Sequence, residues 1–285
     1  MAVDKGDHFL VSGTKKWITN GIYADYFTVL CRTGKGSAGL SMLLLEKKAD
    51  GITTQKMPSM GVWPSGTTYI EFRDVKVPKS NVIGVVGAGF KQTMFNFNHE
   101  RWIISAQAWR MMSTCVSEAL TWAQSRRTFG KALVQHQVIQ HKLAEMIRVT
   151  EATYANLESI TAMMKAMSRD EQNAKLGGHI ALLKNQTTKS LEFCAREAMQ
   201  ILGGTGYSRG VCTSVQFGEK VERIYREVRA FSIPAGSEEI MLNLAVRQLG
   251  LAPAPRKKSP KAELKEMETA RDALQKKIEA AKAKL

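Results

Sequence analysis

The sequence has little cysteine and no cysteine or histidine pattern that is typical of a metal site. No two of the four cysteines form a Cys-x-x-Cys pair; they stand at Cys31, Cys115, Cys194 and Cys212. The five histidines show no ligand spacing, and His136 and His141 are five residues apart, on different parts of a helix. This pattern argues against a metal site and favours a reducing compartment.

The chain also lacks a hydrophobic run of about 18 uncharged residues, so we expect no membrane span. The N-terminus, MAVDKGDHFLVSG, has neither the apolar core of a signal peptide nor the Arg-rich, acid-free composition of a transit peptide. Because residue 1 can be a truncation point, a targeting signal is not readable from this chain. Mitochondrial and cytoplasmic locations both stay open.

Acidic residues are outnumbered, and the formal net charge is +15. One third of this excess lies in residues 252–285, and the rest is spread along the chain without a basic aromatic patch. Nucleic-acid binding is therefore disfavoured. The charge favours anionic small-molecule ligands together with a solvated basic surface.

Residues 1–83 are predicted to form a partial antiparallel β-domain, an open sheet or partial barrel. Short runs rich in Val, Ile, Thr and aromatic residues alternate with turn sequences such as GKGSAG and VPKSN. These runs are ADYFTVLCRTG, LSMLLLEKK, GITTQKM and TTYIEFRDVKV.

Residues 84–251 are predicted to form a four-helix bundle, so the fold class is α+β. Within 141–167, apolar residues recur at steps of three and four, at Leu143, Met146, Ile147, Thr150, Tyr154, Leu157, Ile160 and Met164. Similar stripes run through 90–125, 171–203 and 237–249, and short connections between long helices favour a bundle.

Residues 252–285 form a third segment, a Pro/Lys linker followed by a charged helical tail. Its apolar positions follow a rough heptad, which Arg271 interrupts. A marginal, solvated helix is therefore the preferred interpretation over a stable coiled coil.

KKWITNG, residues 15–21, is predicted to be a strand that enters a turn. Trp17 and Thr19 are two residues apart and would project from one face, where a ring and a hydroxyl suit a planar heteroaromatic ligand. The alternative is an ordinary half-buried strand that ends in an Asn-Gly turn.

SRRTFGKALVQHQ, residues 125–137, is predicted to be a loop between two helices. Arg126 could bind a phosphate in bidentate fashion, and Phe129 could cover an adenine. The alternative is a solvated interhelical loop.

Two further loops are weaker signals. QILGGTGY, residues 200–207, could let a backbone approach a phosphate, but helices often end in glycine. IPAGSEEIM, residues 233–241, enters a helix with Ser237 as a natural N-cap and with Glu238 and Glu239 in the first turn. Its amides could also hold an anion, although plain capping explains most of the pattern.

In their order, these motifs resemble the acyl-CoA dehydrogenases. The resemblance covers about residues 10 to 250 and rests on KKWITNG, FRDVKVP, RRTFGKALVQHQ, QILGGTGY, VERIYREVR and GSEEIM. It implies FAD bound between the β-domain and the bundle, and oxidation of an acyl-CoA to its trans-2-enoyl form. It also implies a homo-oligomer, dimer or tetramer, and transfer of electrons to an electron-transferring flavoprotein.

The resemblance also implies the residues that contact FAD and substrate. Trp17 and Thr19 match residues that flank the flavin, and Arg101 matches an arginine near the CoA part of the substrate. The remaining FAD contacts are implied at Arg126, Thr128, Phe129, Gln137, Gln200, Gly204, Ser237 and Glu239. In the family, the set that includes Arg126 often comes from a neighbouring subunit, and the position of Glu239 is usually Gln.

Two departures from the family pattern bear on function. The N-terminal helical domain and the early β-segment that holds the flavin's pyrimidine end are absent, so a fragment, a shortened gene model and a paralogue with another role are alternatives. The usual catalytic base falls on Ala235, which cannot accept a proton. A minority, the isovaleryl and long-chain types, carries the base on the long helix, and that position matches Glu100.

We therefore expect a dehydrogenase with Glu100 as catalytic base. The alternatives are a catalytically inactive paralogue that acts in assembly or interaction, and an acyl-CoA oxidase that reacts with oxygen. The sequence leaves the length and branching of the acyl group open.

Overall fold

A computed structural model describes residues 1–209 and 218–251 of the chain. Contacts between residues divide the chain into two compact units, Met1–Leu249 and Gly250–Leu285. The first unit carries every helix and strand described below. The predicted tail helix within 252–285 lies outside the described residues. None of the helices in 1–209 and 218–251 is long and apolar enough to cross a membrane.

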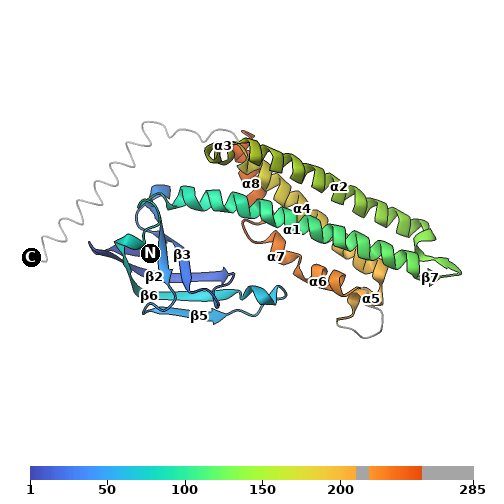
Figure 1. Cartoon of the computed structure of the whole chain (residues 1–285), viewed down its shortest axis with the longest axis horizontal. Coiled ribbons are helices and arrows are strands. Elements are labelled where there is room, and N and C mark those ends of the chain that lie inside the picture. The colour runs from blue at the N-terminus through green and yellow to red at the C-terminus, as the bar shows by residue number, and fades with distance from the viewer. Residues whose placement is uncertain (210–217, 252–285) are drawn as a thin grey trace, which may run out of the picture. The chain divides into compact units, whose positions relative to one another are not determined.

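The N-terminal part is built from antiparallel strands (Figure 1). Four strands form one sheet in the order β1-β2-β6-β5, and β3 pairs with β4 in a second sheet. The strands are β1 Ala2–Asp4, β2 His8–Ile18, β3 Tyr26–Arg32, β4 Leu40–Glu46, β5 Ile52–Lys56 and β6 Thr68–Pro78. The four runs predicted as strands correspond to β3, β4, β5 and β6, so the β prediction is confirmed.

Alternation along these strands explains the β core. In β3, Phe27, Val29 and Cys31 are buried while the residues between them are exposed or half-buried. Leu43 and Leu45 of β4 face them across the ladder. A strand places every second side chain on one face, so this pattern buries one face of the pair against the larger sheet.

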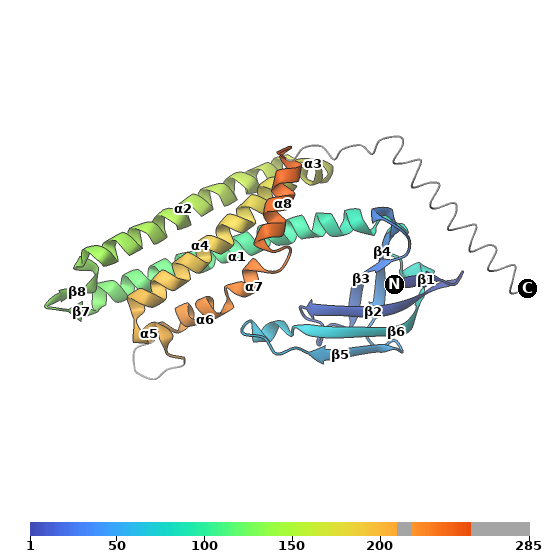
Figure 2. The ribbon, with the colours of Figure 1, turned by 180° about the vertical axis from the view of Figure 1, so that it is seen from behind.

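Helices make up most of the rest of the described chain, and the α+β class is confirmed (Figures 1 and 2). The long helices are α1 Gly89–Ser125, α2 Gln137–Ala166 and α4 Gly177–Leu202. The shorter ones are α3 Arg169–Lys175, α5 Gly204–Tyr207, α6 Glu219–Glu227, α7 Arg229–Ser232 and α8 Glu238–Gln248. A small hairpin, β7 Arg127–Thr128 and β8 Lys131–Ala132, joins α1 to α2.

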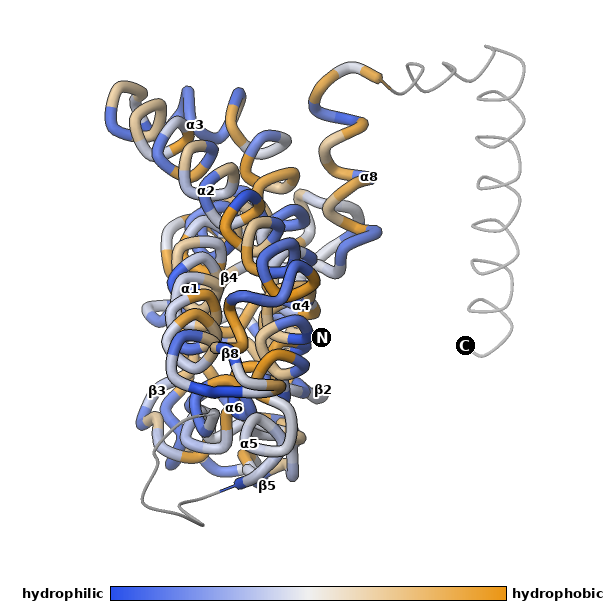
Figure 3. Tube along the Cα trace, turned by 90° about the vertical axis from the view of Figure 1, so that its right-hand side faces the viewer, coloured by the Kyte–Doolittle hydropathy of each residue, from blue (hydrophilic) through white to orange (hydrophobic). Residues whose placement is uncertain are grey.

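The main helical core lies between α1, α2, α4 and α6. Small residues of α1, among them Ala108, Cys115 and Ala119, are fully buried against Leu191 and Ala195 of α4. Small side chains on facing stripes let two helices approach closely. The apolar stripe predicted for α2 is buried at most of its positions. Along α8, hydrophobic and hydrophilic residues alternate in the trace of Figure 3.

The prediction of one continuous helix over 171–203 is wrong. It is divided into α3 and α4 at Leu176, directly before Gly177 and Gly178. A Cβ at Gly177 would lie 2.4 Å from the Gln248 side chain of α8. The glycines therefore allow α8 to pack against the start of α4, a tertiary contact that hydrophobic periodicity cannot indicate.

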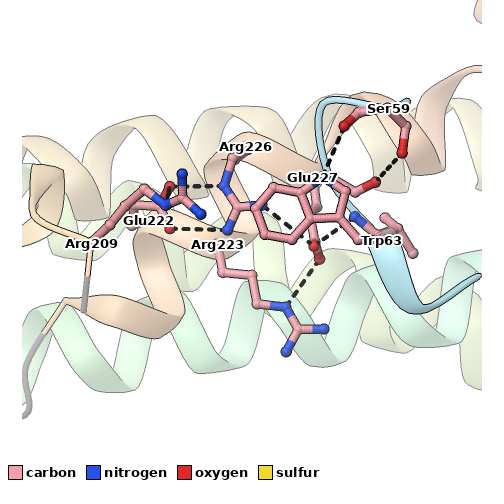
Figure 4. Close-up of polar contacts among 9 residues, drawn as sticks. Ser59, Trp63, Arg209, Glu222, Arg223, Arg226 and Glu227 are labelled. Atoms are coloured by element: carbon pink, nitrogen blue, oxygen red, sulfur yellow. Dashed lines mark hydrogen bonds and ion pairs between the residues drawn. The ribbon is translucent and has the colours of Figure 1, made fainter. Parts of the chain in front are cut away.

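A group of polar contacts around Glu227 and Trp63, called the Glu227 joint below, connects the β5–β6 loop to α6 (Figure 4). The buried Glu227 carboxylate accepts the backbone N–H of Val62 at 2.7 Å and Nε–H of Arg223 at 3.2 Å. The ring of Trp63 lies against two guanidiniums, 4.5 Å from that of Arg226 and 5.1 Å from that of Arg209. This joint fixes the β-domain loop on the helix that leads towards the 233–237 loop.

Candidate functional site

A cavity of about 710 Å³ lies between the two β-sheets and the N-terminal half of α1. Its walls are largely apolar, with Phe27, Val29, Met42, Ile70, Phe72 and Phe97 among the lining residues. Thr19 and Glu100, two of the residues predicted for the site, both line it. The fold thus brings together a hydroxyl from the end of β2 and a carboxylate from α1.

Trp17 is not among the described residues that line this cavity, and its side chain is 73% exposed. The prediction that Trp17 and Thr19 share one strand face assumed regular alternation, and that assumption is wrong here. The pairing of β2 with β6 slips between Lys15 and Ile18, and Trp17 has a φ of 57°. Such a bulge adds one residue to a strand and redirects the side chains that follow.

Glu100 is half-buried and faces the cavity one turn after Asn96. Nδ2–H of Asn96 donates a hydrogen bond to Oε1 of Glu100 at 2.6 Å. The second carboxylate oxygen makes no hydrogen bond or ion pair within the described residues, so it is free for a ligand in the cavity.

The neighbouring Arg101 points to another side of α1. Its side chain is buried, and Nε–H donates to the carbonyl oxygen of Ala235 at 2.8 Å while Nη1–H donates to Oδ1 of Asn98 at 2.9 Å. Burial lowers the pKa of the Arg101 guanidinium from its ordinary value. Arg101 therefore holds the loop that carries Ala235, the position where the sequence lacks a base.

Two buried side chains of α4 hold the same loop. Nζ–H groups of Lys184 donate to the carbonyl oxygens of Ser232 at 2.6 Å and Gly236 at 2.8 Å. Nδ2–H of Asn185 donates to the carbonyl oxygen of Glu238 at 2.8 Å. Lys184 is fully buried, and burial lowers its pKa to about 8.

The loop needs these anchors because its backbone is unusual. Ala235 has a φ of 55° and Gly236 a φ of 112°, in a region that side chains with a Cβ rarely adopt. Ser237 stands at the N-cap of α8 as predicted, but its side chain makes no capping hydrogen bond within the described structure. Instead, the pKa of Glu239 is lowered by a hydrogen bond from its own backbone N–H and by one from the Ser237 side chain.

The β7–β8 hairpin and the helix ends on either side of it carry four of the predicted adenine and diphosphate contacts. Phe129 and Gly130 form its two-residue turn with φ angles of 50° and 79°, and the Phe129 ring is 96% exposed. The hydroxyl of Thr128 and Nε2 of His136 are hydrogen-bonded at 3.0 Å. Arg126, which caps α1 directly before the hairpin, and Gln137, the first residue of α2, are also exposed, so all these side chains are accessible to solvent.

The predicted site residues therefore fall into separate groups. Thr19 and Glu100 lie at the β end of α1, whereas Arg126 follows its other end (Figures 1 and 2). At 1.5 Å per residue, Glu100 and Arg126 are about 39 Å apart along the helix. Gln200 and Gly204, at the end of α4, are exposed and lie at the same end of the bundle as the hairpin.

Sequence reasoning missed Lys184 and Asn96. Lys184 continues the buried stripe of α4 between Ile180 and Thr188, and a lysine in such a stripe is a signal that could have been read. Asn96 stands four residues before Glu100, the spacing at which helix side chains meet.

No group of three or more possible metal ligands occurs within 1–209 and 218–251. Cys31, Cys115 and Cys194 are free and buried, and Cys212 lies outside the described residues.

The chain belongs to the acyl-CoA dehydrogenase family. Residues 87–250 match the family's C-terminal domain, and residues 1–75 match its middle domain.

The chain is similar to acyl-CoA dehydrogenase apdG of Emericella nidulans, with 39% identity over 91% of this chain and 59% of that protein. It is 38% identical to acyl-CoA dehydrogenase AFT10-1 of Alternaria alternata, over 87% of this chain and 57% of that protein. Among solved structures, a probable acyl-CoA dehydrogenase from Mycobacterium abscessus superposes with a TM-score of 0.80 at 33% identity, covering 87% of this chain and 63% of that one. The chain thus spans about three fifths of the length of these relatives.

Proposed function

We propose that this protein is the core of an FAD-dependent acyl-CoA dehydrogenase, with Glu100 as the catalytic base. The observation that carries the proposal is the position of Glu100 in the wall of a large, mainly apolar cavity that Thr19 also lines. Ala235 offers no competing base on the loop held by Arg101.

The residues present are compatible with a flavin. A cavity of about 710 Å³ lies within the range of roughly 300–1,000 Å³ of small-molecule sites, and its apolar walls with a few polar groups are typical of them. Oε1 of Gln92, which also lines the cavity, is buried and has no hydrogen-bond partner among the described residues. An acceptor in that state favours a ligand that donates to it. Bound FAD would accept the hydride that leaves the β-carbon of the acyl group.

The residues of this chain would supply the proton transfer and the orientation. Glu100 would take the α-proton as general base, because its carboxylate reaches the cavity. Thr19 would contact the flavin, and Arg101 would lie near the CoA part of the substrate while it fixes the 235 loop.

A homo-oligomer, dimer or tetramer, is part of this proposal. Arg126, Thr128, Phe129, Gln137, Gln200 and Gly204 would bind the adenosine half of FAD in a neighbouring copy, and Ser237 and Glu239 would complete the contacts. The separation of about 39 Å between Glu100 and Arg126 supports the proposal that the two residues contact two different FAD molecules. The proposed electron acceptor is an electron-transferring flavoprotein.

Anaerobic mixing of FAD-loaded protein with a panel of acyl-CoA thioesters tests the proposal. Wild-type protein should lose its flavin absorbance with at least one thioester. Glu100→Gln should retain FAD and thioester binding but not bleach. Glu118→Gln, at the only other carboxylate of α1, is the matched control and should behave as wild type.

Two results would favour the alternatives. FAD-loaded wild-type protein that no acyl-CoA bleaches would favour a non-catalytic assembly role. Rapid oxygen consumption with substrate would favour an acyl-CoA oxidase.

A further inference from the structure

We propose that Asn96 is a positioning residue, which holds the Glu100 carboxylate in the orientation needed for proton abstraction. This inference rests on the proposed role of Glu100 as base. It assigns a function to a side chain that belongs neither to the predicted cofactor set nor to the predicted substrate set.

The contact follows from helix geometry. Asn96 and Glu100 are four residues apart on α1, so both side chains lie on one face, and both line the cavity. Nδ2–H of Asn96 reaches Oε1 of Glu100 at 2.6 Å. Hydrogen bonds to ionised groups are shorter and stronger than those between neutral groups, so a carboxylate that acts as a base would be held firmly by this contact.

Asn96 is exposed and Glu100 is half-buried, and the bond between them is the contact that orients the carboxylate. No other hydrogen bond or ion pair to Glu100 occurs in the described residues. A glutamate side chain has three rotatable bonds, so an unheld carboxylate would sample several orientations. With one site of Oε1 taken by Asn96, the other oxygen has both of its lone pairs free for a proton in the cavity.

A second asparagine binds the adjacent cation, Arg101. Oδ1 of Asn98 accepts from Nη1–H of Arg101 at 2.9 Å, while Nε–H of the same guanidinium is bound to Ala235. Arg101 is thereby engaged on the loop side of α1. Consecutive residues of a helix do not face each other, so Asn96 holds Glu100 on the cavity side while Asn98 holds Arg101 on the loop side.

The hydrogen bond itself can be tested without turnover. In protein with ¹⁵N-labelled asparagine, the side-chain amide signal that disappears in Asn96→Leu identifies Asn96. We expect Glu100→Gln to shift this signal and Glu118→Gln to leave it in place. An Asn96 signal that does not respond to Glu100→Gln would overturn the inference.

The consequence for catalysis is measured by the rate of flavin reduction in FAD-loaded protein. Asn96→Leu has nearly the same shape but no donor, and should slow reduction by about ten- to a hundredfold, since small misplacements of a reacting group have effects of this size. FAD content and the dissociation constant of the acyl-CoA should not change. Asn96→Gln, which keeps an amide donor, should recover most of the rate.

Gln107→Leu removes an exposed amide from the same helix and serves as the control. Asn96→Leu that bleaches at the wild-type rate would overturn the positioning role even if the amide signal responds. The Asn96 amide signal could instead respond to Glu100→Gln while no acyl-CoA bleaches the flavin of wild-type protein. That pair of results would overturn the proposed function and leave the hydrogen bond supported. The two failures are therefore distinguishable.

Discussion

Lys184 on α4 donates from its ammonium to the carbonyl oxygen of Gly236 at 2.8 Å, deep inside the protein. A second bond joins it to the carbonyl oxygen of Ser232. A fully buried lysine held by main-chain carbonyls is unusual, because burial disfavours the charged form. Here that burial lowers the lysine pKa to about 8.

This shift predicts a dependence of stability on pH. Between pH 8 and about 10.5, the folded protein has released the Lys184 proton while the unfolded chain still holds it, so stability should rise with pH. The free energy of unfolding of wild type relative to Lys184→Met should increase by at most about 3 kcal/mol across this range. Urea titrations of both proteins at several pH values measure the difference, and a flat difference would contradict the prediction.

The Glu227 joint should contribute to stability. Glu227→Ala leaves the Val62 N–H without its acceptor and removes the partner of Arg223, which should cost about 1–3 kcal/mol in the free energy of unfolding. Glu145→Ala, which removes an exposed ion pair with Arg148, should cost clearly less, because water screens that pair. Equal losses in denaturant titrations of the two variants would argue that the joint adds nothing.

Gly61 offers a second test of the same joint. A Cβ at Gly61 would lie 2.5 Å from Cγ of Glu227. Gly61→Ala must therefore displace the carboxylate or the loop, and the melting temperature should fall. In the Glu227→Ala background the same substitution should have a smaller effect, and an unchanged effect would show that the crowding lies elsewhere.

Phe129 should matter for cofactor binding and not for folding. Because its ring is 96% exposed, Phe129→Ala should change the free energy of unfolding by no more than about 0.5 kcal/mol. Loss of an aromatic contact to adenine should weaken FAD binding by about 0.5–1.5 kcal/mol in calorimetry. Phe9→Ala, at a buried ring of the β core, is the contrasting control and should cost about 3–5 kcal/mol in stability.

The buried thiols should resist alkylation. Burial raises the pKa of Cys194 to about 12 and raises the pKa values of Cys115 and Cys31 as well. Since the thiolate is the reactive form, iodoacetamide at pH 8 should label these three residues only after unfolding. Peptide mapping by mass spectrometry separates them from Cys212, and labelling of Cys194 in native protein would contradict the prediction.

Local pattern predicted the elements well and their tertiary details poorly. Alternation in β3 and periodicity in α2 follow from the one-sided burial of strands and helices, so both could be read from sequence. The break before Gly177 depends on α8, and the bulge near Trp17 depends on pairing with β6. Both features depend on a segment far away in the sequence, which the pattern of neighbouring residues does not reveal.

The candidate site was predictable only in part. Family resemblance pointed to Thr19 and Glu100, and the fold places both on one cavity. The anchoring of the 235 loop by Arg101 and Lys184 was not predicted, because it joins residues more than 45 positions apart through backbone carbonyls. Carbonyl acceptors are present at every residue, so the sequence does not mark which ones are used.

The distance between the two ends of α1 has a genetic consequence. If the hairpin of one copy completes the cavity of another, a defect at Glu100 and a defect at Arg126 belong to different sites in a mixed assembly. Chains carrying Glu100→Gln and chains carrying Arg126→Ala, each inactive alone, would then form some sites with both residues intact. Co-expression of the two defective forms should restore part of the activity, which is intragenic complementation between alleles of one gene.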